Sequence, residues 1–233
     1  METVGCFKKK FTMKLFSAVA LCFLYAGISA QNTYIPDDSF EQYLIWMELD
    51  DVLNDSVLTE NIINVQALHL GYSSINDLTG LEGFLSLDTL DISELQDSEI
   101  SYLDMSVVPW LKYLDCYNQN GQIDSINLAQ NIDLQFLDAS GNTITQLDLS
   151  NNSVLEYLEI NFNQLSEIDL SNNSFLKDIG INNNTLTSLD LGNNNLLENL
   201  MVNFNQLTEI DLSNKPNLIN VYCEENNISV LDI

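Results

Sequence analysis

The chain has 233 residues, of which 34 are Asp or Glu and only 7 are Lys or Arg, so its formal charge is −27 at neutral pH. Hydrophobic residues make up 45% of the chain, which is enough for a buried core and excludes a disordered acidic tail. Phosphate backbones and anionic lipid headgroups are bound through clusters of Lys and Arg, so this composition excludes nucleic acid and anionic membrane surfaces as partners.

Residues 1–30 have the order of a secretory signal peptide. Four of the seven basic residues fall in the first 14 positions, an apolar run follows over residues 15–28, and Ser29 and Ala30 end the segment. The apolar run is shorter than the roughly 20 residues that a membrane span needs. We therefore expect cleavage near Ala30, which leaves two parts: an N-terminal cap over residues 31–64 and a repeat region over residues 65–233.

The cap is predicted to contain an amphipathic helix. Apolar residues at positions 40, 43, 44 and 47 follow a spacing of three and four, and Asp38 and Glu41 have the spacing of a capping box. Such a cap covers the end of the first coil of a repeat protein. The acidic stretch at residues 50–55 lacks the ligand spacing and central Gly of a calcium loop, so we predict a solvated turn there.

A repeat organises the rest of the chain. Leu residues 21 residues apart, preceded by apolar residues at spacings of 22 to 24, mark about eight coils, the last of them incomplete: Val65, Leu87, Leu111, Leu134, Leu155, Leu176, Leu197 and Leu218. Strand alternation places Leu158 and Ile160 inside and Tyr157 and Glu159 outside. A single coil cannot bury its apolar face alone, so the coils are predicted to stack around one core.

An Asn recurs where each strand is predicted to turn away: Asn142, Asn163, Asn184, Asn205 and Asn226. A buried amide can donate to and accept from the backbone of neighbouring coils. We interpret these residues as structural.

A second segment of each coil alternates apolar, acidic and apolar residues, which indicates a second strand. Its acids form a column: Asp148, Asp169, Asp190, Asp211 and Asp232. Like charges opposite one another destabilise a sheet, so this column needs compensation. Hydrogen bonds from neighbouring Ser, Thr and backbone groups are the favoured explanation, and calcium bound between the carboxylates is the alternative. The Ser, Gly and Asn clusters after each segment, such as residues 150–152, are predicted to form tight turns.

The pattern LxxLxLxxNxL, filled by Leu155, Leu158, Ile160, Asn163 and Leu165, resembles the leucine-rich repeat family over about residues 65–233. The nested second segment resembles the bacterial 21-residue class, which includes internalin-like secreted adhesins. Residues 31–61 are also similar to the cap of secreted bacterial members. The resemblance implies a repeat solenoid, mainly β, with parallel strands on both faces and a short N-terminal helical cap, and it implies a binding function.

The cysteines and the histidine do not indicate a disulfide, a catalytic site or a zinc site. Cys116 and Cys223 hold the same place in coils five apart, about 24 Å at the spacing of paired strands, which is too far for a disulfide. We predict two buried apolar thiols. His69 is predicted to be a solvated imidazole, because the surrounding residue types complete neither a catalytic triad nor a zinc site. We therefore expect no enzymatic activity.

The outward positions of the first sheet combine acids and aromatics. The acids are Asp91, Asp115, Asp138 and Glu159, and the aromatics beside them are Tyr72, Tyr113, Tyr117, Phe136, Tyr157, Phe162, Phe204 and Tyr222. Solvent-facing aromatics are typical of recognition surfaces. The alternative is that they stack only to support the sheet.

Taken together, the sequence predicts an exported binding module, secreted or on a bacterial cell surface, that recognises a protein, peptide or glycan. A protein partner is expected to carry basic patches. The alternative is a structural surface or matrix protein that assembles through cation bridging or by stacking end to end at the coil that ends at Ile233. We expect no cofactor, with calcium at the Asp column as the one candidate.

Overall fold

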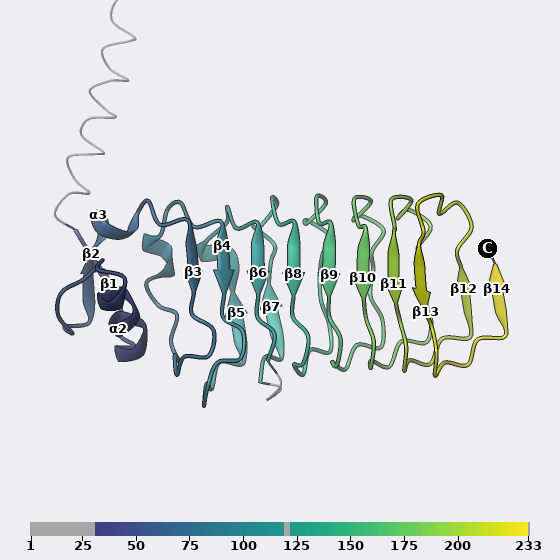
Figure 1. The fold of residues 1–233 in the computed structure, drawn as a ribbon, viewed down its shortest axis with the longest axis horizontal. Coiled ribbons are helices and arrows are strands. Elements are labelled where there is room, and N and C mark those ends of the chain that lie inside the picture. The colour runs from purple at the N-terminus through teal and green to yellow at the C-terminus, as the bar shows by residue number, and fades with distance from the viewer. Residues whose placement is uncertain (1–30, 119–121, 233) are drawn as a thin grey trace, which may run out of the picture.

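The computed structural model describes residues 31–118 and 122–232 and shows a row of stacked coils with a cap at the N-terminal end (Figure 1). The predicted signal peptide lies outside the described residues. Each coil gives one strand to a sheet that runs along the row, and the chain then returns along the opposite face. The predicted solenoid, mainly β, is therefore confirmed.

The main sheet contains eight parallel strands. In chain order they are β3 (Ala67–His69), β4 (Thr89–Asp91), β6 (Tyr113–Asp115), β8 (Phe136–Asp138), β9 (Tyr157–Glu159), β10 (Asp178–Gly180), β11 (Asn199–Met201) and β13 (Asn220–Tyr222). Neighbouring strands pair without any offset, so Leu90 lies opposite both Leu68 and Leu114. Equivalent positions of successive coils therefore form straight rows across the sheet.

The inward residues form one continuous core, as predicted. Leu158, in the middle of β9, and Ile160, two residues later, are both 0% exposed, and so is Leu155 at the start of the same coil. Equivalent residues of the neighbouring coils are buried in the same way. Burial of this Leu and Ile set between coils is the main stabilising contribution to the fold.

The opposite face is only partly a sheet. β5 (Tyr102–Asp104) pairs in parallel with β7 (Ser125–Asn127), and β12 (Glu209–Asp211) pairs in parallel with β14 (Val230–Asp232). Within the described residues, no strand forms at 147–149, 168–170 or 189–191. The prediction of parallel strands on both faces is thus confirmed near the two ends of the row and wrong in the middle coils.

Facing carboxylates alone do not account for this gap. β12 and β14 pair with Asp211 opposite Asp232, and the main sheet pairs with Asp91, Asp115 and Asp138 opposite one another.

The predicted Asn ladder is confirmed. Asn163 is buried, its Oδ1 accepts a hydrogen bond from Ile144 N at 2.9 Å, and its Nδ2 donates to Ala139 O at 2.9 Å. Asn142, Asn184, Asn205 and Asn226 each make the equivalent two contacts with the coil before their own. Each amide therefore satisfies an N–H group and a carbonyl group of the coil before it.

A second Asn ladder runs along the opposite face. Asn173, which is 0% exposed, donates through Nδ2 to Leu149 O at 3.1 Å and to Asn152 O at 2.9 Å. Asn131, Asn152 and Asn194 donate in the same way to carbonyls of the preceding coil. The assignment of these Ser and Asn clusters to simple turns was incomplete, because one Asn in each cluster joins two coils.

The N-terminal cap combines a strand pair with two helices. β1 (Asn32–Tyr34) pairs antiparallel with β2 (Ser56–Leu58), α2 (Asp38–Trp46) lies between them in the chain, and α3 (Thr59–Ile62) follows. Two single 3-10 turns, η1 (Leu81–Gly83) and η2 (Met105–Val107), lie in the first coils. The predicted amphipathic helix is confirmed, with Phe40 and Leu44 fully buried.

The predicted capping box is wrong. Asp37, not Asp38, is the N-cap of α2, and its Oδ1 accepts from Ser39 N and Phe40 N at 2.9 Å. Its Oδ2 accepts from Asn76 N at 2.8 Å, which ties the helix to the first coil. Glu41 turns away from the cap because its buried carboxylate accepts from the backbone N–H groups of residues 54–56.

Both cysteines of the solenoid are free, as predicted. Cys116 is 0% exposed, and burial raises the pKa of its thiol well above the ordinary value, so it is not a thiolate nucleophile. Cys223 is only half-buried, contrary to our prediction. It lies in the coil that contains β13, and β13 pairs with a strand on one side only among the described residues.

Candidate functional site

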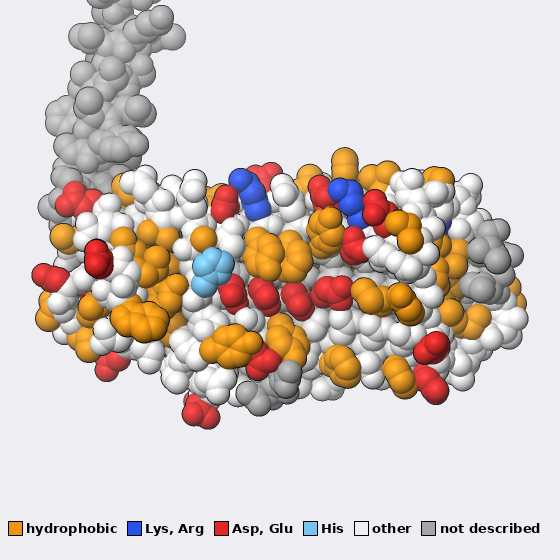
Figure 2. All heavy atoms as spheres, in the orientation of Figure 1, with side chains coloured by type: hydrophobic (Ala, Val, Ile, Leu, Met, Phe, Trp, Pro, Cys, Tyr) orange, Lys and Arg blue, Asp and Glu red, His pale blue; other side chains and the backbone are white. Residues whose placement is uncertain are grey.

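The predicted acids form an uninterrupted row on the outer face of the main sheet. Asp115 lies opposite Asp91 on one side and Asp138 on the other, and Asp138 lies opposite Glu159. Figure 2 shows this band of acidic side chains, with hydrophobic side chains above and below it and the histidine at its N-terminal end. We call Asp91, Asp115, Asp138 and Glu159 the acid row.

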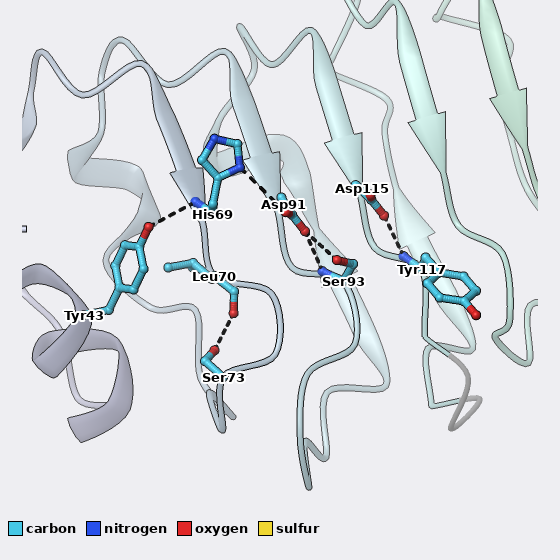
Figure 3. Close-up of polar contacts among 8 residues, drawn as sticks. All are labelled: Tyr43, His69, Leu70, Ser73, Asp91, Ser93, Asp115 and Tyr117. Carbon is cyan, nitrogen blue, oxygen red and sulfur yellow. Dashed lines mark hydrogen bonds and ion pairs between the residues drawn. The ribbon is translucent and has the colours of Figure 1, made fainter. Parts of the chain in front are cut away.

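Local hydrogen bonds hold the carboxylates in place. Asp91 Oδ1 accepts from Ser93 N at 3.0 Å and from Ser93 Oγ at 2.7 Å, and Asp115 Oδ1 accepts from Tyr117 N at 3.1 Å (Figure 3). Asp138 Oδ1 accepts from Ser140 N at 2.9 Å. Each Asp thus uses one oxygen to fix the turn after its strand.

The two ends of the acid row differ. At the N-terminal end, His69 Nδ1 lies 3.6 Å from Asp91 Oδ2, and the His69 side chain is 63% exposed (Figure 3). At the other end, Glu159 lies opposite Gly180 in β10, and a Cβ built on Gly180 would overlap the Glu159 carboxylate. The row therefore ends with a carboxylate that lies over the next strand.

Burial makes the middle of this row hard to ionise. Burial, reinforced by the neighbouring carboxylates of Asp138 and Asp91, raises the pKa of Asp115 to about 6. Burial also raises the pKa of Glu159, as does the nearby charge of Asp138. Ionisation of the row at neutral pH therefore has a free-energy cost, and a cation bound beside the carboxylates would lower it.

A row of aromatic side chains runs beside the acids. Tyr113, Phe136 and Tyr157 are the first residues of β6, β8 and β9 and lie opposite one another. The Tyr113 and Phe136 rings stack with centroids 4.2 Å apart and planes 6° apart, whereas Phe136 and Tyr157 are tilted by 37° at 6.3 Å. We call these three residues the aromatic row.

Three further aromatics have unusual backbone geometry. Tyr72, Phe162 and Phe204 have φ values of 62°, 53° and 55°, in the left-handed region that favours Gly and Asn. The three residues are 74%, 61% and 54% exposed. The sequence placed these side chains outside, but residue type alone does not report the sign of φ.

The structure brings together only part of the predicted surface. The acid row and the aromatic row occupy four adjacent strands, β4, β6, β8 and β9. Tyr117 is half-buried beside them, at the turn after β6. Phe204 and Tyr222 belong to later coils and do not contact the stacked rings; Tyr222 lies opposite Met201 instead.

The Asp column on the opposite face is compensated by hydrogen bonds. Ser150 N donates to Asp148 Oδ1 at 2.9 Å, and the equivalent N–H donates to Asp169, Asp190 and Asp211. Hydrogen bonds from the following Ser lower the pKa values of Asp148, Asp169 and Asp211. The favoured explanation is therefore confirmed for these residues, and calcium binding at the column stays a prediction.

One group of three carboxylates could hold a cation among residues 31–118 and 122–232, and it lies in the cap. It consists of Asp38, Glu41 and Asp55, whose oxygens lie within 4.8 Å of one another. Both oxygens of Glu41 already accept backbone hydrogen bonds. Over the same residues, no helix is long and apolar enough to cross a membrane.

Comparison with known proteins assigns the fold. No family model and no curated protein matches the sequence. Internalin C2 of Listeria monocytogenes is 23% identical with a TM-score of 0.70, and the match covers 86% of this chain and 91% of that protein. A leucine-rich repeat protein of Leptospira interrogans is 17% identical with a TM-score of 0.65, covering 75% of this chain and 50% of that one.

A plant structure is also similar. The leucine-rich repeat ectodomain of the receptor kinase GASSHO1/SCHENGEN3 of Arabidopsis thaliana is 19% identical with a TM-score of 0.52, covering 71% of this chain and 25% of that one. These likenesses confirm that the chain has an internalin-like leucine-rich repeat fold. A fold of this kind does not by itself identify a ligand.

Proposed function

We propose that this chain is an exported, non-enzymatic binding module that recognises a protein or peptide with the outer face of its main sheet. One observation carries the proposal: the acid row of four adjacent, in-register strands runs beside the aromatic row, which three of the same strands carry. Figure 2 shows hydrophobic side chains along this acidic band. Leucine-rich repeat folds generally act as binding scaffolds. The plant ectodomain, for example, was solved in complex with CASPARIAN STRIP INTEGRITY FACTOR 2.

The packing of the aromatic row suits a protein or peptide. Tyr113 and Phe136 turn one face toward each other at 4.2 Å, and both side chains are half-buried. Their exposed edges suit the side chains and backbone of a polypeptide.

Charge defines the partner further. The chain has a formal charge of −27, and the acid row concentrates negative charge on the binding face. A protein with exposed Lys or Arg would be steered toward this face, whereas nucleic acid and anionic membranes would be repelled. We therefore propose a partner with a basic patch.

Variants on opposite faces test the proposal with matched charge changes. Asp115→Asn with Asp138→Asn removes two charges from the acid row, and Asp148→Asn with Asp169→Asn removes two from the opposite face. In affinity capture from culture or host material, we expect the same partner with the original chain and with the second variant, but not with the first. Equal capture by both variants would place binding elsewhere.

Export is a separate part of the proposal. It rests on the order of basic, apolar and small residues over positions 1–30. We expect mass spectrometry of the secreted product to find Gln31 at or near the N-terminus. Recovery of the intact opening segment in a membrane fraction would contradict export with cleavage.

The alternative function, a structural matrix protein, is favoured by one observation. The last described coils expose apolar side chains: Ile219 is 71% exposed, Tyr222 49% and Val230 50%. Association through this surface, or cation bridging between acidic faces, would build larger assemblies. Light scattering during a calcium titration separates the two functions, because a monomeric binder keeps its size and a matrix protein grows.

A further inference from the structure

The main face changes character between its two halves. In β4, β6, β8 and β9 the acid row carries negative charge beside the aromatic row. From β10 onward the same two rows hold, in pairs, Asp178 and Gly180, Asn199 and Met201, and Asn220 and Tyr222. Asp178 accepts a hydrogen bond from Asn199, and Asn199 Oδ1 accepts one from Asn220 Nδ2 at 2.7 Å. The second half is therefore dominated by polar amides and apolar side chains.

Two exposed phenylalanines, one in the turn after β9 and one in the turn after β11, occupy backbone positions that strain them. Phe162 and Phe204 have φ values of 53° and 55°. The equivalent turn holds Gly141, with φ 70°, and Asn183, with φ 56°, in the coils next to Phe162, and Glu225, with φ 55°, in the coil after Phe204. Gly and Asn adopt this conformation with less strain than a bulky aromatic. The chain thus carries Phe where its own neighbouring coils show that a less strained residue fits.

Exposure makes this choice more unfavourable still. Phe162 is 61% exposed, Phe204 is 54% exposed and Tyr222 is 49% exposed. Together with half-buried Met201, which lies opposite Tyr222, these residues form what we call the apolar patch. Strained backbone combined with exposed aromatic surface is typical of residues retained for binding rather than for stability.

We propose, resting on the function proposed above, that the partner docks along the solenoid axis with two chemically different parts. A segment rich in Lys or Arg lies on the acid row, and large apolar side chains beside it contact the apolar patch. Glu159 and Met201 stand two strands apart, and Asp115 and Met201 stand four strands apart, about 10 and 19 Å at the spacing of paired strands. An extended chain covers these distances in about three to six residues.

A second copy of this chain does not fit that description. Only Lys112, Lys177 and Lys215 are basic among the described residues, and the two binding faces would bring like charges together. The occupant is therefore a different polypeptide, one in which basic and apolar residues alternate in short blocks.

The test uses a random peptide library displayed on phage as its probe, panned against the secreted chain. We expect the enriched peptides to contain at least two Lys or Arg residues and a large apolar residue three to six positions away. Synthetic forms of these peptides are then titrated against four variants: Asp115→Asn with Asp138→Asn, Phe136→Ala with Tyr157→Ala, Phe162→Asn with Phe204→Asn, and Phe175→Asn. Phe175 is the matched control, because it is 51% exposed in a different turn.

We expect Phe162→Asn with Phe204→Asn to weaken binding about tenfold or more while its melting temperature stays the same or rises, because Asn fits the strained turns. Phe175→Asn should leave the affinity unchanged. Three results would overturn the proposal of a two-part partner. They are peptides that bind the Phe162 and Phe204 variant as tightly as the original chain, enriched peptides that lack the apolar residue, and no enrichment of basic peptides. Peptides that also bind undiminished to the acid-row variant and to Phe136→Ala with Tyr157→Ala would overturn the proposed function itself.

Discussion

Glu159 occupies the space that a side chain at position 180 would need, so that Gly180 and the carboxylate of Glu159 fit together across β9 and β10. The carboxylate also accepts a hydrogen bond from Asn161 Nδ2 at 2.5 Å. This arrangement keeps the last charge of the acid row partly buried, and burial is the main reason why the pKa of Glu159 is raised.

Gly180→Ala should therefore displace the Glu159 carboxylate rather than unfold the chain. The carboxylate is the end of a flexible side chain, so we expect the free energy of unfolding to change by less than about 1 kcal/mol. The pKa of Glu159 should move back toward its ordinary value as the group enters solvent. A carboxyl titration followed by NMR measures this shift. Gly192→Ala is the control, because its Cβ would meet only Asp190 Oδ1, at 3.1 Å.

Asp115→Asn should stabilise the protein at neutral pH. The pKa of Asp115 is about 6 in the folded chain against an ordinary 3.8, so between these pH values the folded chain binds more protons than the unfolded chain. Stability is then lost as pH rises from about 4 to 6. After allowing for solvent screening, we expect the substitution to add about 1 kcal/mol at pH 7.5 and almost nothing at pH 4.

Urea denaturation of this variant at the two pH values provides the measurement. Asp148→Asn serves as the control on the opposite face, where hydrogen bonds from Ser150 lower the pKa of the carboxylate. Loss of that charge should not stabilise the chain at neutral pH. An equal gain at both pH values for Asp115→Asn would mean that its ionisation is not the cause.

The second Asn ladder should contribute strongly to stability. Asn173→Ala leaves the buried carbonyls of Leu149 and Asn152 without their side-chain donor, and we expect a loss of about 2 kcal/mol or more. Asn172 is exposed, and Asn172→Ala should change the free energy of unfolding by at most about 0.5 kcal/mol. Thermal or chemical denaturation compares the two variants. Similar losses would show that the ladder is not responsible.

The aromatic row should matter for binding more than for folding. Phe136→Ala with Tyr157→Ala is expected to leave the far-ultraviolet spectrum largely intact and to cost about 2 kcal/mol or more in binding. Asp138→Asn should mainly slow association and flatten its salt dependence. Surface plasmon resonance with the captured partner at two salt concentrations distinguishes these effects. A double aromatic variant that binds as tightly as the original would move the recognition surface to another face.

Calcium should stabilise the chain modestly if it binds the Asp column. We expect the melting temperature to rise by about 2–4 °C, more than in sodium chloride of equal ionic strength. Asp169→Asn with Asp190→Asn should remove the difference, whereas Asp38→Asn should remove it only if the cap holds the ion. Equal responses to the two salts would leave general screening of the acidic faces as the explanation.

Periodicity explains why much of this fold could be predicted. A constant spacing fixes which residues face inward, so the burial of Leu158 and the contacts of Asn163 follow from the repeat. Two kinds of feature could not be predicted: those that depend on backbone angles, and those that depend on which of two neighbouring residues of the same type takes a role. Asp37 and Asp38 are both good N-cap residues, and Asn172 and Asn173 have the same side chain but opposite exposure.

The site was predictable to a similar degree. Alternation along the strand predicted the outward acids and aromatics, and register aligned Asp115 with Asp138. The stacking of Tyr113 on Phe136 depends on side-chain rotamers. The strain at Phe162 depends on a turn that Gly141 and Asn183 share. Gly141 and Asn183 hint at that turn, but Phe204 and Glu225 hold the same position with positive φ, so residue type does not identify it.

The constant coil length has an evolutionary consequence. Asn163 reaches back 19 residues to Ile144 N and 24 residues to Ala139 O, and the same two intervals recur at each step of that ladder from Asn163 to Asn226. Duplication of one 21-residue unit would therefore preserve every such contact while lengthening the face by about 4.8 Å. A gene segment that encodes one such unit can be gained or lost while the packing of the core is kept. The length of the binding face can therefore change independently of the side chains that each coil presents.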